Sequence, residues 1–454
     1  MPSDGQTAML PPACKSCLKI HATHVTLSTI NKGTRRMTDQ PKTIAIVGAG
    51  IVGVSTAIWL QRAGHNVVLI ERETQAGEAT SYGNAGLLAS CAVVPVTVPG
   101  LMLKAPGMLF GRDQPLFLRW GYLPRMMPWL VKYLSHANAG EARRIAAALK
   151  GVIGDSLNDH LALADGTGAA HWIVPSDYLF LYRDRGDFGH DAFGWQVRRE
   201  LGYEWDELER SALTRYDSIF SDAVGFAARL GDHGRISDPG AYVKALAAHA
   251  VAQGAKMINA TVTDFVRENG RITGVRASGE TIPCDDVVLA TGAWSKSLGA
   301  KLGLDVPLET ERGYHIELWQ PSTMPRSPVM VAAGKFVMTP MEGRLRLAGV
   351  VELGGLDAAP SKAPTALLRR HLARVLPDLS WAEETEWMGH RPAPADSIPA
   401  IGEVPGIKGA WVGFGHHHVG LTGGPKTGRL LAQMISEQKP NLDMAAYSPA
   451  RFAH

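Results

Sequence analysis

Cysteine is scarce in this chain, and neither charge is in surplus. The 454 residues include four cysteines, too few and too scattered for a disulfide framework, which favours a reducing, cytoplasmic location. The 46 basic and 43 acidic residues nearly balance, so composition gives no reason to expect nucleic acid as a partner. A chain of this length with 45% apolar residues exceeds what one core usually organises, so we expect two domains.

Residues 1–36 lack the sustained apolar run of a signal peptide or a spanning helix. We interpret them as a disordered extension or, since Met37 closely precedes the first predicted strand, as a mis-assigned start. Cys14 and Cys17 have no second ligand pair at zinc spacing, so a bland tail is favoured over a metal site.

A glycine-rich turn between a strand and a helix is the clearest signal in the sequence. Residues 43–47 form a short apolar, largely β-branched run, which is typical of a buried parallel strand. Gly48 permits a tight turn, Gly50 lets the backbone approach a pyrophosphate, and Gly53 lets the helix lie close to the sheet. The start of that helix directs free N–H groups at phosphates. The segment therefore predicts a dinucleotide site.

Glu71 ends a second predicted strand, residues 66–70, about 20 residues after the glycines, as this type of site requires. Its carboxylate can accept both ribose hydroxyls and would repel a 2′-phosphate, so NADP is disfavoured. Residues 43–60 are apolar enough to imitate a membrane span, but their polar flanks favour the nucleotide turn.

The chain after Glu71 favours FAD over NAD, because the regular strand–helix repeats of a simple dehydrogenase do not continue. The small and hydroxyl residues of 80–88 can place N–H groups against a phosphate and then run along an isoalloxazine ring. Residues 286–294 predict another buried strand with a glycine turn. Residues 410–415 lead into three histidines and a helix that begins near Gly420, whose N-terminus suits an electron-rich flavin edge.

These segments, with Gly389–Pro392, resemble the D-amino-acid oxidase superfamily of flavoproteins, and most closely its bacterial D-amino-acid dehydrogenase-like branch, over residues 42–452. The resemblance implies FAD bound without a covalent link, because members that attach it use a cysteine near the C-terminal region and none follows Cys284. It also implies that the backbone of Val262 contacts the adenine. The residues expected to contact FAD are Gly48, Gly50, Ile51, Val52, Gly53, Glu71, Arg72, Thr80, Ser81, Asn84, Ala85, Gly86, Leu87, Leu88, Val262, Thr291, Gly292, Trp294, Gly415, His416, His417, Gly420, Leu421 and Thr422.

The predicted fold class is α/β, or α+β overall, with a Rossmann-type FAD-binding domain interleaved with a smaller antiparallel-sheet substrate domain. Residues 236–300 include a helix capped by Asp238, and alternating patterns at 336–338 and 344–350 predict strands of the second domain. The FAD-binding domain is expected over 37–88, 138–168, 222–302 and 391–454. The substrate domain is expected over 89–137, 169–221 and 303–390.

Arg391 is the candidate anchor for a substrate carboxylate, because a guanidinium fork matches a carboxylate and the residue stands at the corresponding position of the family. An interdomain ion pair is the alternative. Tyr314 can add a hydroxyl, line the pocket or pack in the core, and His315 and His418 complete the candidate set. No acid–base residue is required if the substrate amine enters deprotonated, since hydride transfer leaves an imine that water hydrolyses.

The run of His416, His417 and His418 invites a metal assignment, but adjacent residues cannot all face one ion, so we expect no metal. The resemblance places His416 beside the flavin. It also places His417 where relatives usually have glycine, which adds bulk and a titratable group near the site.

The sequence therefore predicts an enzyme that oxidises a D-amino acid to the 2-oxo acid and ammonia and passes electrons to a quinone or another acceptor. A D-proline or hydroxyproline dehydrogenase and a glycine or sarcosine-type oxidase remain alternatives, as does an NAD-dependent dehydrogenase. A non-catalytic FAD-binding accessory subunit is the alternative of another class, although such a protein has no need of Arg391.

Residues 99–136 mix aromatic and apolar side chains with basic ones, which is typical of a lip that faces a membrane. Such a lip would give a cytoplasmic enzyme peripheral contact with the inner membrane, where a respiratory acceptor lies. A proline-broken lid or core segment is the favoured alternative, because a substrate domain needs apolar residues in any case.

Overall fold

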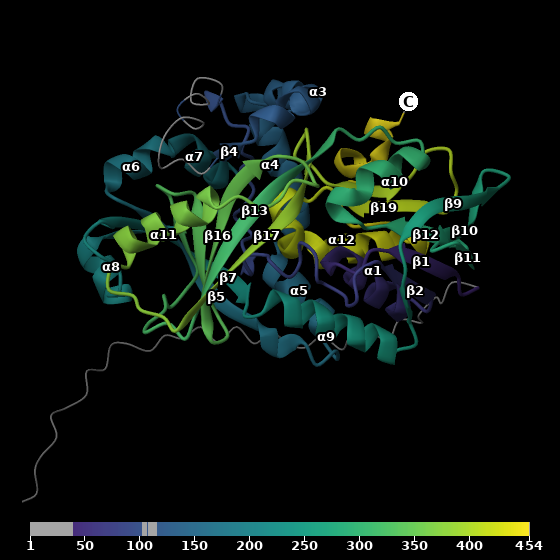
Figure 1. The fold of residues 1–454 in the computed structure, drawn as a ribbon, viewed down its shortest axis with the longest axis horizontal. Helices are drawn as coiled ribbons and strands as arrows, with labels where there is room; N and C mark the ends of the chain where they lie inside the picture. The colour runs from purple at the N-terminus through teal and green to yellow at the C-terminus, as the bar shows by residue number, and fades with distance from the viewer. Residues whose placement is uncertain (1–39, 102–106, 108–115, 454) are drawn as a thin grey trace, which may run out of the picture.

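The computed structural model describes residues 40–101, 107 and 116–453. The sequence interpretations that concern Cys14, Cys17 and Met37 lie outside these residues. Figure 1 shows two sheet-containing lobes, with the parallel strands around β1 in one and the large sheet around β13 and β16 in the other.

A six-stranded sheet of order β18-β19-β12-β1-β2-β8 forms the core of the first lobe. All neighbours pair in parallel except β18 and β19. A parallel sheet is covered on both faces, which is why its strands are almost continuously apolar. Its strands are β1 (Thr43–Val47), β2 (Asn66–Glu71), β8 (Lys256–Asn259), β12 (Asp286–Leu289), β18 (Ala400–Glu403) and β19 (Ala410–Phe414).

The two faces of β1 contact different layers, because successive side chains of a strand point to opposite sides. Ile44 and Ile46 pack against the helical layer, whereas Ala45 and Val47 pack against the smaller three-stranded sheet. The helices are α1 (Ile51–Arg62), α4 (Ala139–Ile153), α5 (Ser156–Ala164), α9 (Pro239–Ala252) and α12 (Gly420–Ile435). The opposite side carries β9 (Val262–Glu268), β10 (Arg271–Ala277), β11 (Glu280–Pro283) and α10 (Ser295–Lys301).

Two local features position these helices, and the first confirms the cap expected from the sequence. The Asp238 side chain accepts a hydrogen bond from the Ala241 amide at 2.9 Å and caps α9. Helix α12 lies close to α1, since a Cβ at Gly428 would stand 2.6 Å from the Ser55 carbonyl carbon. This close crossing fixes the N-terminus of α12 near the nucleotide turn.

The second lobe is built on a ten-stranded, mainly antiparallel sheet of order β17-β13-β16-β15-β14-β5-β7-β3, with β4 beside β16 and β6 beside β7. Its apolar side packs against α11 (Ala363–Val375). The strands are β3 (Leu87–Leu88), β4 (Leu116–Leu118), β5 (Ile173–Tyr182), β6 (Asp206–Glu209), β7 (Phe226–Ile236), β13 (Leu308–Trp319), β14 (Val329–Val331), β15 (Phe336–Met341), β16 (Arg344–Leu353) and β17 (Glu383–Pro394). The remaining helices are α3 (Leu123–Ser135), α6 (Arg185–His190), α7 (Ala192–Glu200) and α8 (Arg210–Tyr216).

The predicted fold class is confirmed, with a Rossmann-type domain beside an antiparallel-sheet domain. One expected segment boundary differs, because β7 lies within 222–302 yet pairs with β5 in the ten-stranded sheet. The reason is local: β7 ends at Ile236 and Asp238 caps α9, so the chain passes between the lobes without a linker. Residues 391–394 likewise complete β17 of the large sheet.

Candidate active site

A cavity of about 1110 Å³ lies between the two lobes. The turns that follow β1, β2, β12 and β19 form one wall, and strands β13, β16 and β17 contribute to the other. A crevice at the carboxyl ends of parallel strands is where open α/β sheets bind their ligands. The topology thus places the nucleotide turn and the candidate substrate residues around one space.

The glycine turn has no room for side chains. Gly48 has a φ of +101°, and a Cβ there would meet the Ala290 carbonyl oxygen at 2.6 Å. A Cβ at Gly53 would stand 1.9 Å from the Gly48 carbonyl oxygen. These close approaches bring the start of α1 to the end of β1 at the wall of the cavity, an arrangement that fits a pyrophosphate.

Glu71 is held at the end of β2 by two backbone amides. Its Oε2 accepts from Ala49 N at 2.6 Å and its Oε1 from Glu73 N at 3.1 Å, so the carboxylate stands beside the glycine turn. The next residue, Arg72, lies over the ring of Trp294 at 3.8 Å from guanidinium carbon to ring centre. A carboxylate so placed suits ribose hydroxyls, and the planar Arg–Trp stack closes the cavity beside it.

The loop of residues 80–88 crosses from the nucleotide turn to the large sheet. Ser81 Oγ accepts from Ile51 N at 3.0 Å at the first turn of α1, and Thr80 Oγ1 donates to the His390 carbonyl at 2.6 Å. Arg346 donates to the carbonyls of Tyr82, at 3.0 Å, and Asn84. These contacts fix a loop whose backbone borders the cavity, as a flavin ring requires.

Most of the residues expected to contact FAD line this cavity, including Val262 of β9. Three do not. Gly53 packs on the Gly48 carbonyl, a Cβ at Gly86 would meet the Ile236 carbonyl oxygen at 2.7 Å, and Leu88 is fully buried in the core. Their position supports the turn and the loop from behind, and the other residues fit FAD.

Arg391 lies on β17 directly opposite Glu311 of β13. Its side chain crosses Gly313, since a Cβ there would stand 2.6 Å from the guanidinium carbon. Burial lowers the pKa of Arg391, and the Glu311 carboxylate opposes that shift. The guanidinium has no hydrogen-bond acceptor or ion-pair partner within 4.0 Å among the described residues, so its donors are available to a ligand in the cavity.

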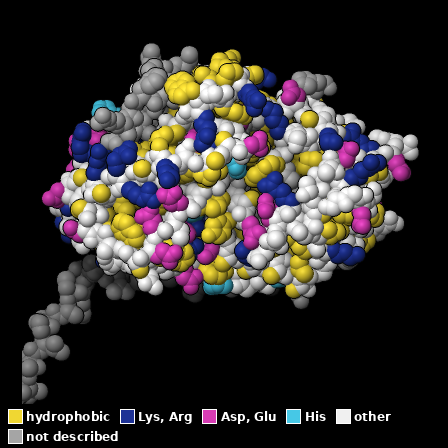
Figure 2. All heavy atoms as spheres, viewed as in Figure 1, with side chains coloured by type: hydrophobic (Ala, Val, Ile, Leu, Met, Phe, Trp, Pro, Cys, Tyr) yellow, Lys and Arg dark blue, Asp and Glu magenta, His cyan; other side chains and the backbone are white. Residues whose placement is uncertain are grey.

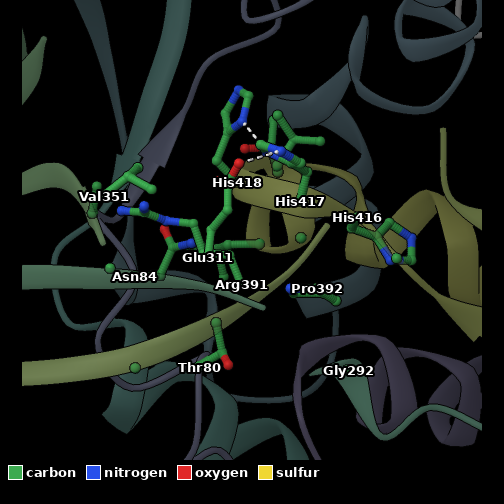
Figure 3. Close-up of a pocket in the computed structure, with 18 of the residues that line it drawn as sticks. Thr80, Asn84, Gly292, Glu311, Val351, Arg391, Pro392, His416, His417 and His418 are labelled. Atoms are coloured by element: carbon green, nitrogen blue, oxygen red, sulfur yellow. Dashed lines mark hydrogen bonds and ion pairs between the residues drawn. The ribbon is translucent and has the colours of Figure 1, made fainter. Parts of the chain in front are cut away.

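Glu311 also lines the cavity and was not predicted from the sequence. It is 6% exposed, and its Oε1 lies 3.0 Å from Nε2 of His417 (Figure 3). Burial alone would raise the pKa of this carboxyl, but His417, followed by Arg391 and His418, holds it below its usual value. No local sequence signal marks Glu311, because its place opposite Arg391 follows only from the pairing of β13 with β17.

The three histidines point in different directions. His416 is buried, its Nε2 lies 2.8 Å from Thr427 Oγ1, and burial lowers its pKa to about 4. His417 has a φ of +52° in the left-handed region, and its Nδ1 lies 2.8 Å from Nδ1 of His418. His418 stands with its ring open to the cavity although protein surrounds it, and burial followed by His417 lowers its pKa to about 3. In the described part of the chain, no three His, Cys, Asp or Glu residues could hold a metal ion.

Tyr314 and His315 stand apart from Arg391. Tyr314 contributes to the cavity wall, but its hydroxyl donates to Glu352 Oε2 at 2.6 Å and accepts from Ser361 N at 3.0 Å. His315 stacks on Trp387 with ring centres 5.1 Å apart, its Nδ1 lies 3.1 Å from the Gly83 carbonyl oxygen, and it is not among the lining residues. The geometry therefore brings Arg391, Glu311, His417 and His418 together and leaves these two at the periphery.

Apolar side chains, which the sequence did not single out, form much of the remaining wall. They come from β5, β14, β15 and β16, and helix α3 covers the cavity with Met126, Trp129 and Tyr133. The lining members of the four strands are Tyr178, Phe180, Tyr182, Met330, Val337, Ala348, Gly349, Val351 and Leu353.

Comparison with known proteins identifies the family. A family model described as FAD dependent oxidoreductase matches residues 43–434. The chain belongs to this family. The predicted family resemblance and FAD as the cofactor are thus confirmed.

Members of this FAD-dependent oxidoreductase family resemble the chain over nearly its whole length. It is 40% identical over 415 residues to a protein of Bradyrhizobium diazoefficiens named D-amino-acid oxidase, covering 90% of this chain and 98% of that protein. It is 31% identical over 421 residues to a D-amino acid dehydrogenase of Xanthobacter autotrophicus, covering 90% and 99%. Glycine oxidase from Geobacillus kaustophilus superposes with a TM-score of 0.70 at 22% identity, covering 91% and 100%.

Proposed function

We propose that this flavoprotein oxidises a D-amino acid to the corresponding 2-oxo acid and ammonia. The observation that carries the proposal is the buried guanidinium of Arg391, which faces the cavity beside the flavin loop with no protein acceptor among the described residues. A carboxylate is the ligand that such a planar fork binds best. The relatives named D-amino-acid oxidase and D-amino acid dehydrogenase support an amino acid as its source.

The chain would hold FAD between the glycine turn, Glu71 and residues 80–88. Bound FAD supplies an acceptor for the hydride that leaves the substrate Cα. Arg391 orients the carboxylate so that Cα faces that acceptor, and positioning of this kind supplies much of the rate in such reactions. Helix α3 covers the cavity and limits the entry of water during the oxidation. Water hydrolyses the imine only afterwards, to the 2-oxo acid and ammonia.

The walls favour an apolar substrate side chain. Phe180, Met330, Val337 and Val351 line the same cavity as Arg391, and covering apolar surface with an apolar ligand is favourable by roughly 25 cal/mol per Å². We propose that aliphatic or aromatic D-amino acids bind better than acidic ones.

Two alternatives within the same chemistry are an oxidase of glycine or sarcosine and a dehydrogenase of D-proline or hydroxyproline. The solved structures of glycine oxidase and of L-proline dehydrogenase from P. horikoshii, with TM-scores of 0.70 and 0.67, share the fold only. Rapid reaction of the reduced protein with dioxygen would favour an oxidase over a dehydrogenase. A non-catalytic accessory subunit leaves the open cavity donors of Arg391 without a purpose.

We propose a quinone as the electron acceptor, reached at a membrane surface by the outward face of α3. Met127 and Val131 are 42% and 60% exposed on α3, Trp120 in the turn before it is 56% exposed, and Arg125 and Lys132 are exposed beside them. Figure 2 shows this apolar area on the crest of the molecule, over α3. Among the described residues, no helix could cross a membrane. Peripheral contact through apolar and basic side chains fits such a face.

The first test of the function is flavin absorbance under nitrogen while D- and L-amino acids and imino acids are added singly. Bleaching by D-amino acids supports the proposal, and bleaching by imino acids alone moves it to the proline-type alternative. No bleaching by any amino or imino acid would contradict it.

Arg391→Ala tests the anchor itself. Loss of a buried charge partner should lower kcat/KM at least about 30-fold, corresponding to about 2 kcal/mol, chiefly through KM. FAD should stay bound, as judged by the ratio of flavin to protein absorbance. Arg276→Ala, on the exposed face of β10, is the matched control, and equal kinetics for both variants would refute the role of Arg391.

A further inference from the structure

Glu311 and Arg391 form an unusual pair across two strands. They are direct register partners on β13 and β17, a position at which side chains normally lie close together. Opposite charges there usually form a structural ion pair. Here no ion pair within 4.0 Å joins them among the described residues, although each shifts the pKa of the other.

Each partner keeps polar atoms available to the cavity. Glu311 uses Oε1 for His417, and its Oε2 has no hydrogen-bond donor in the described part of the chain. The donors of Arg391 are likewise without an acceptor there. Figure 3 shows both side chains projecting into the same cavity, with the Glu311 carboxyl turned to His417 and the Arg391 guanidinium turned towards Asn84 and Val351. A buried charge left unsatisfied is costly, so the geometry calls for a ligand that carries both charges.

His417 maintains this separation. Its contact with Oε1 draws the Glu311 carboxylate away from Arg391, and its φ of +52° is a backbone conformation that glycine adopts without strain.

This inference rests on the proposed function. We propose that Glu311 recognises the α-amino group of the substrate, which binds as an ammonium ion and loses one proton to solvent before hydride transfer, while Arg391 binds its carboxylate. The ammonium and carboxylate groups of an amino acid are bonded to the same carbon, and Glu311 and Arg391 stand directly opposite each other on paired strands, so both side chains can reach one substrate. Glu311 is thus a specificity-determining residue that separates amino acids from 2-hydroxy acids, and His417 is the positioning residue that holds it.

The test measures binding rather than turnover. FAD-loaded protein is reduced with dithionite under nitrogen, so that it cannot oxidise the ligand, and calorimetry gives dissociation constants for two matched pairs: glycine with glycolate, and D-alanine with D-lactate. The wild type should bind each amino acid more tightly than its hydroxy acid. In Glu311→Gln that preference should fall at least about tenfold, mostly through weaker binding of the amino acid.

Two further variants make the result specific. His417→Gly, which relieves the backbone and removes the clamp, should reduce the same preference by a smaller factor. Glu309→Gln makes the same chemical change two residues away on β13, where the carboxylate accepts from Tyr122 OH at 3.1 Å, and should leave the preference unchanged.

The inference is overturned if the wild type binds glycine no more tightly than glycolate. It is also overturned if Glu311→Gln keeps the wild-type preference, or weakens both members of each pair equally, since Glu311 would then only support Arg391. A failure of the proposed function looks different, because no amino acid would bleach the oxidised flavin whatever these binding ratios are.

Discussion

Replacing Glu317 should destabilise the protein and loosen the flavin loop together. Its Oε1 accepts from Arg344 Nε at 2.6 Å and from Arg346 Nε and Nη2 at 2.9 and 2.6 Å, all at buried positions. Glu317→Ala leaves Arg344 with Asp238, at 3.0 Å, but leaves Arg346 with carbonyl oxygens only. Breaking a buried pair from one side costs about 3 to 5 kcal/mol, so we expect a loss of that size in unfolding free energy.

The assay is urea unfolding followed by tryptophan fluorescence, with FAD affinity measured on the same preparations. Affinity should fall as well, because Arg346 holds the carbonyls of Tyr82 and Asn84 in the flavin loop. Glu383→Ala, at the exposed end of β17, should change stability by less than about 0.5 kcal/mol. A loss below about 1 kcal/mol for Glu317→Ala would refute the argument from the buried network.

The pH dependence supplies a second check. Burial alone would raise the pKa of Glu317, but Arg346 and Arg344 hold it below its usual value of 4.5. A carboxyl with a depressed pKa stabilises the fold above the unfolded pKa and loses that contribution as pH falls through the folded one. The stability difference between wild type and Glu317→Gln should therefore be constant above about pH 5 and shrink in more acidic solution.

Four further outcomes are expected. Gly53→Ala should abolish FAD binding, measured by flavin absorbance, because its Cβ would stand 1.9 Å from the Gly48 carbonyl oxygen; a variant that retains FAD contradicts the packing argument. Acid precipitation should release all FAD into the supernatant, whereas colour kept in the pellet would show a covalent link. Burial lowers the pKa values of His160 and His416 to about 4, so these side chains bind fewer protons in the folded than in the unfolded protein. The melting temperature should therefore fall as the pH drops from 6.5 towards 4. Excess FAD in every sample keeps the flavin content equal at all pH values. Val131→Asp should reduce co-sedimentation with anionic vesicles, whereas Leu161→Asp, at another exposed apolar position, should not. Equal effects of the two substitutions would contradict membrane contact through α3.

The sequence predicted those parts of the molecule that local chemistry specifies. Gly48, Gly53 and Glu71 could be assigned because a tight turn, a close helix approach and an acid at a strand end each need one residue type at one spacing. Asp238 could be predicted as the N-cap of α9 for the same reason, because a capping side chain bonds only to the first turn of its own helix. Arg391 required the family resemblance, since a lone arginine carries no local signal.

The remainder depended on contacts between distant segments. Glu311 becomes meaningful only when β13 pairs with β17, which no local pattern specifies. Tyr314 was a reasonable candidate by position, but its hydroxyl is engaged by Glu352, a partner on β16. The placement of β7 was missed because its pairing with β5, a distant strand of the other lobe, is not specified by its own residues. Tertiary pairing, rather than residue type, decided all three.

Strand β17 holds the carboxylate anchor separately from the side chains that contact the rest of the substrate. Its backbone carbonyls at His390 and Ala393 accept hydrogen bonds from Thr80 and Trp129, so main-chain atoms on both sides of Arg391 tie it to the flavin loop and to α3. The apolar wall, in contrast, consists of side chains on other strands, such as Phe180 and Val351. Substitutions in that wall can alter which substrate is accepted while Arg391 keeps its place. Related proteins can therefore differ in substrate specificity without a change in the carboxylate anchor or in the flavin loop.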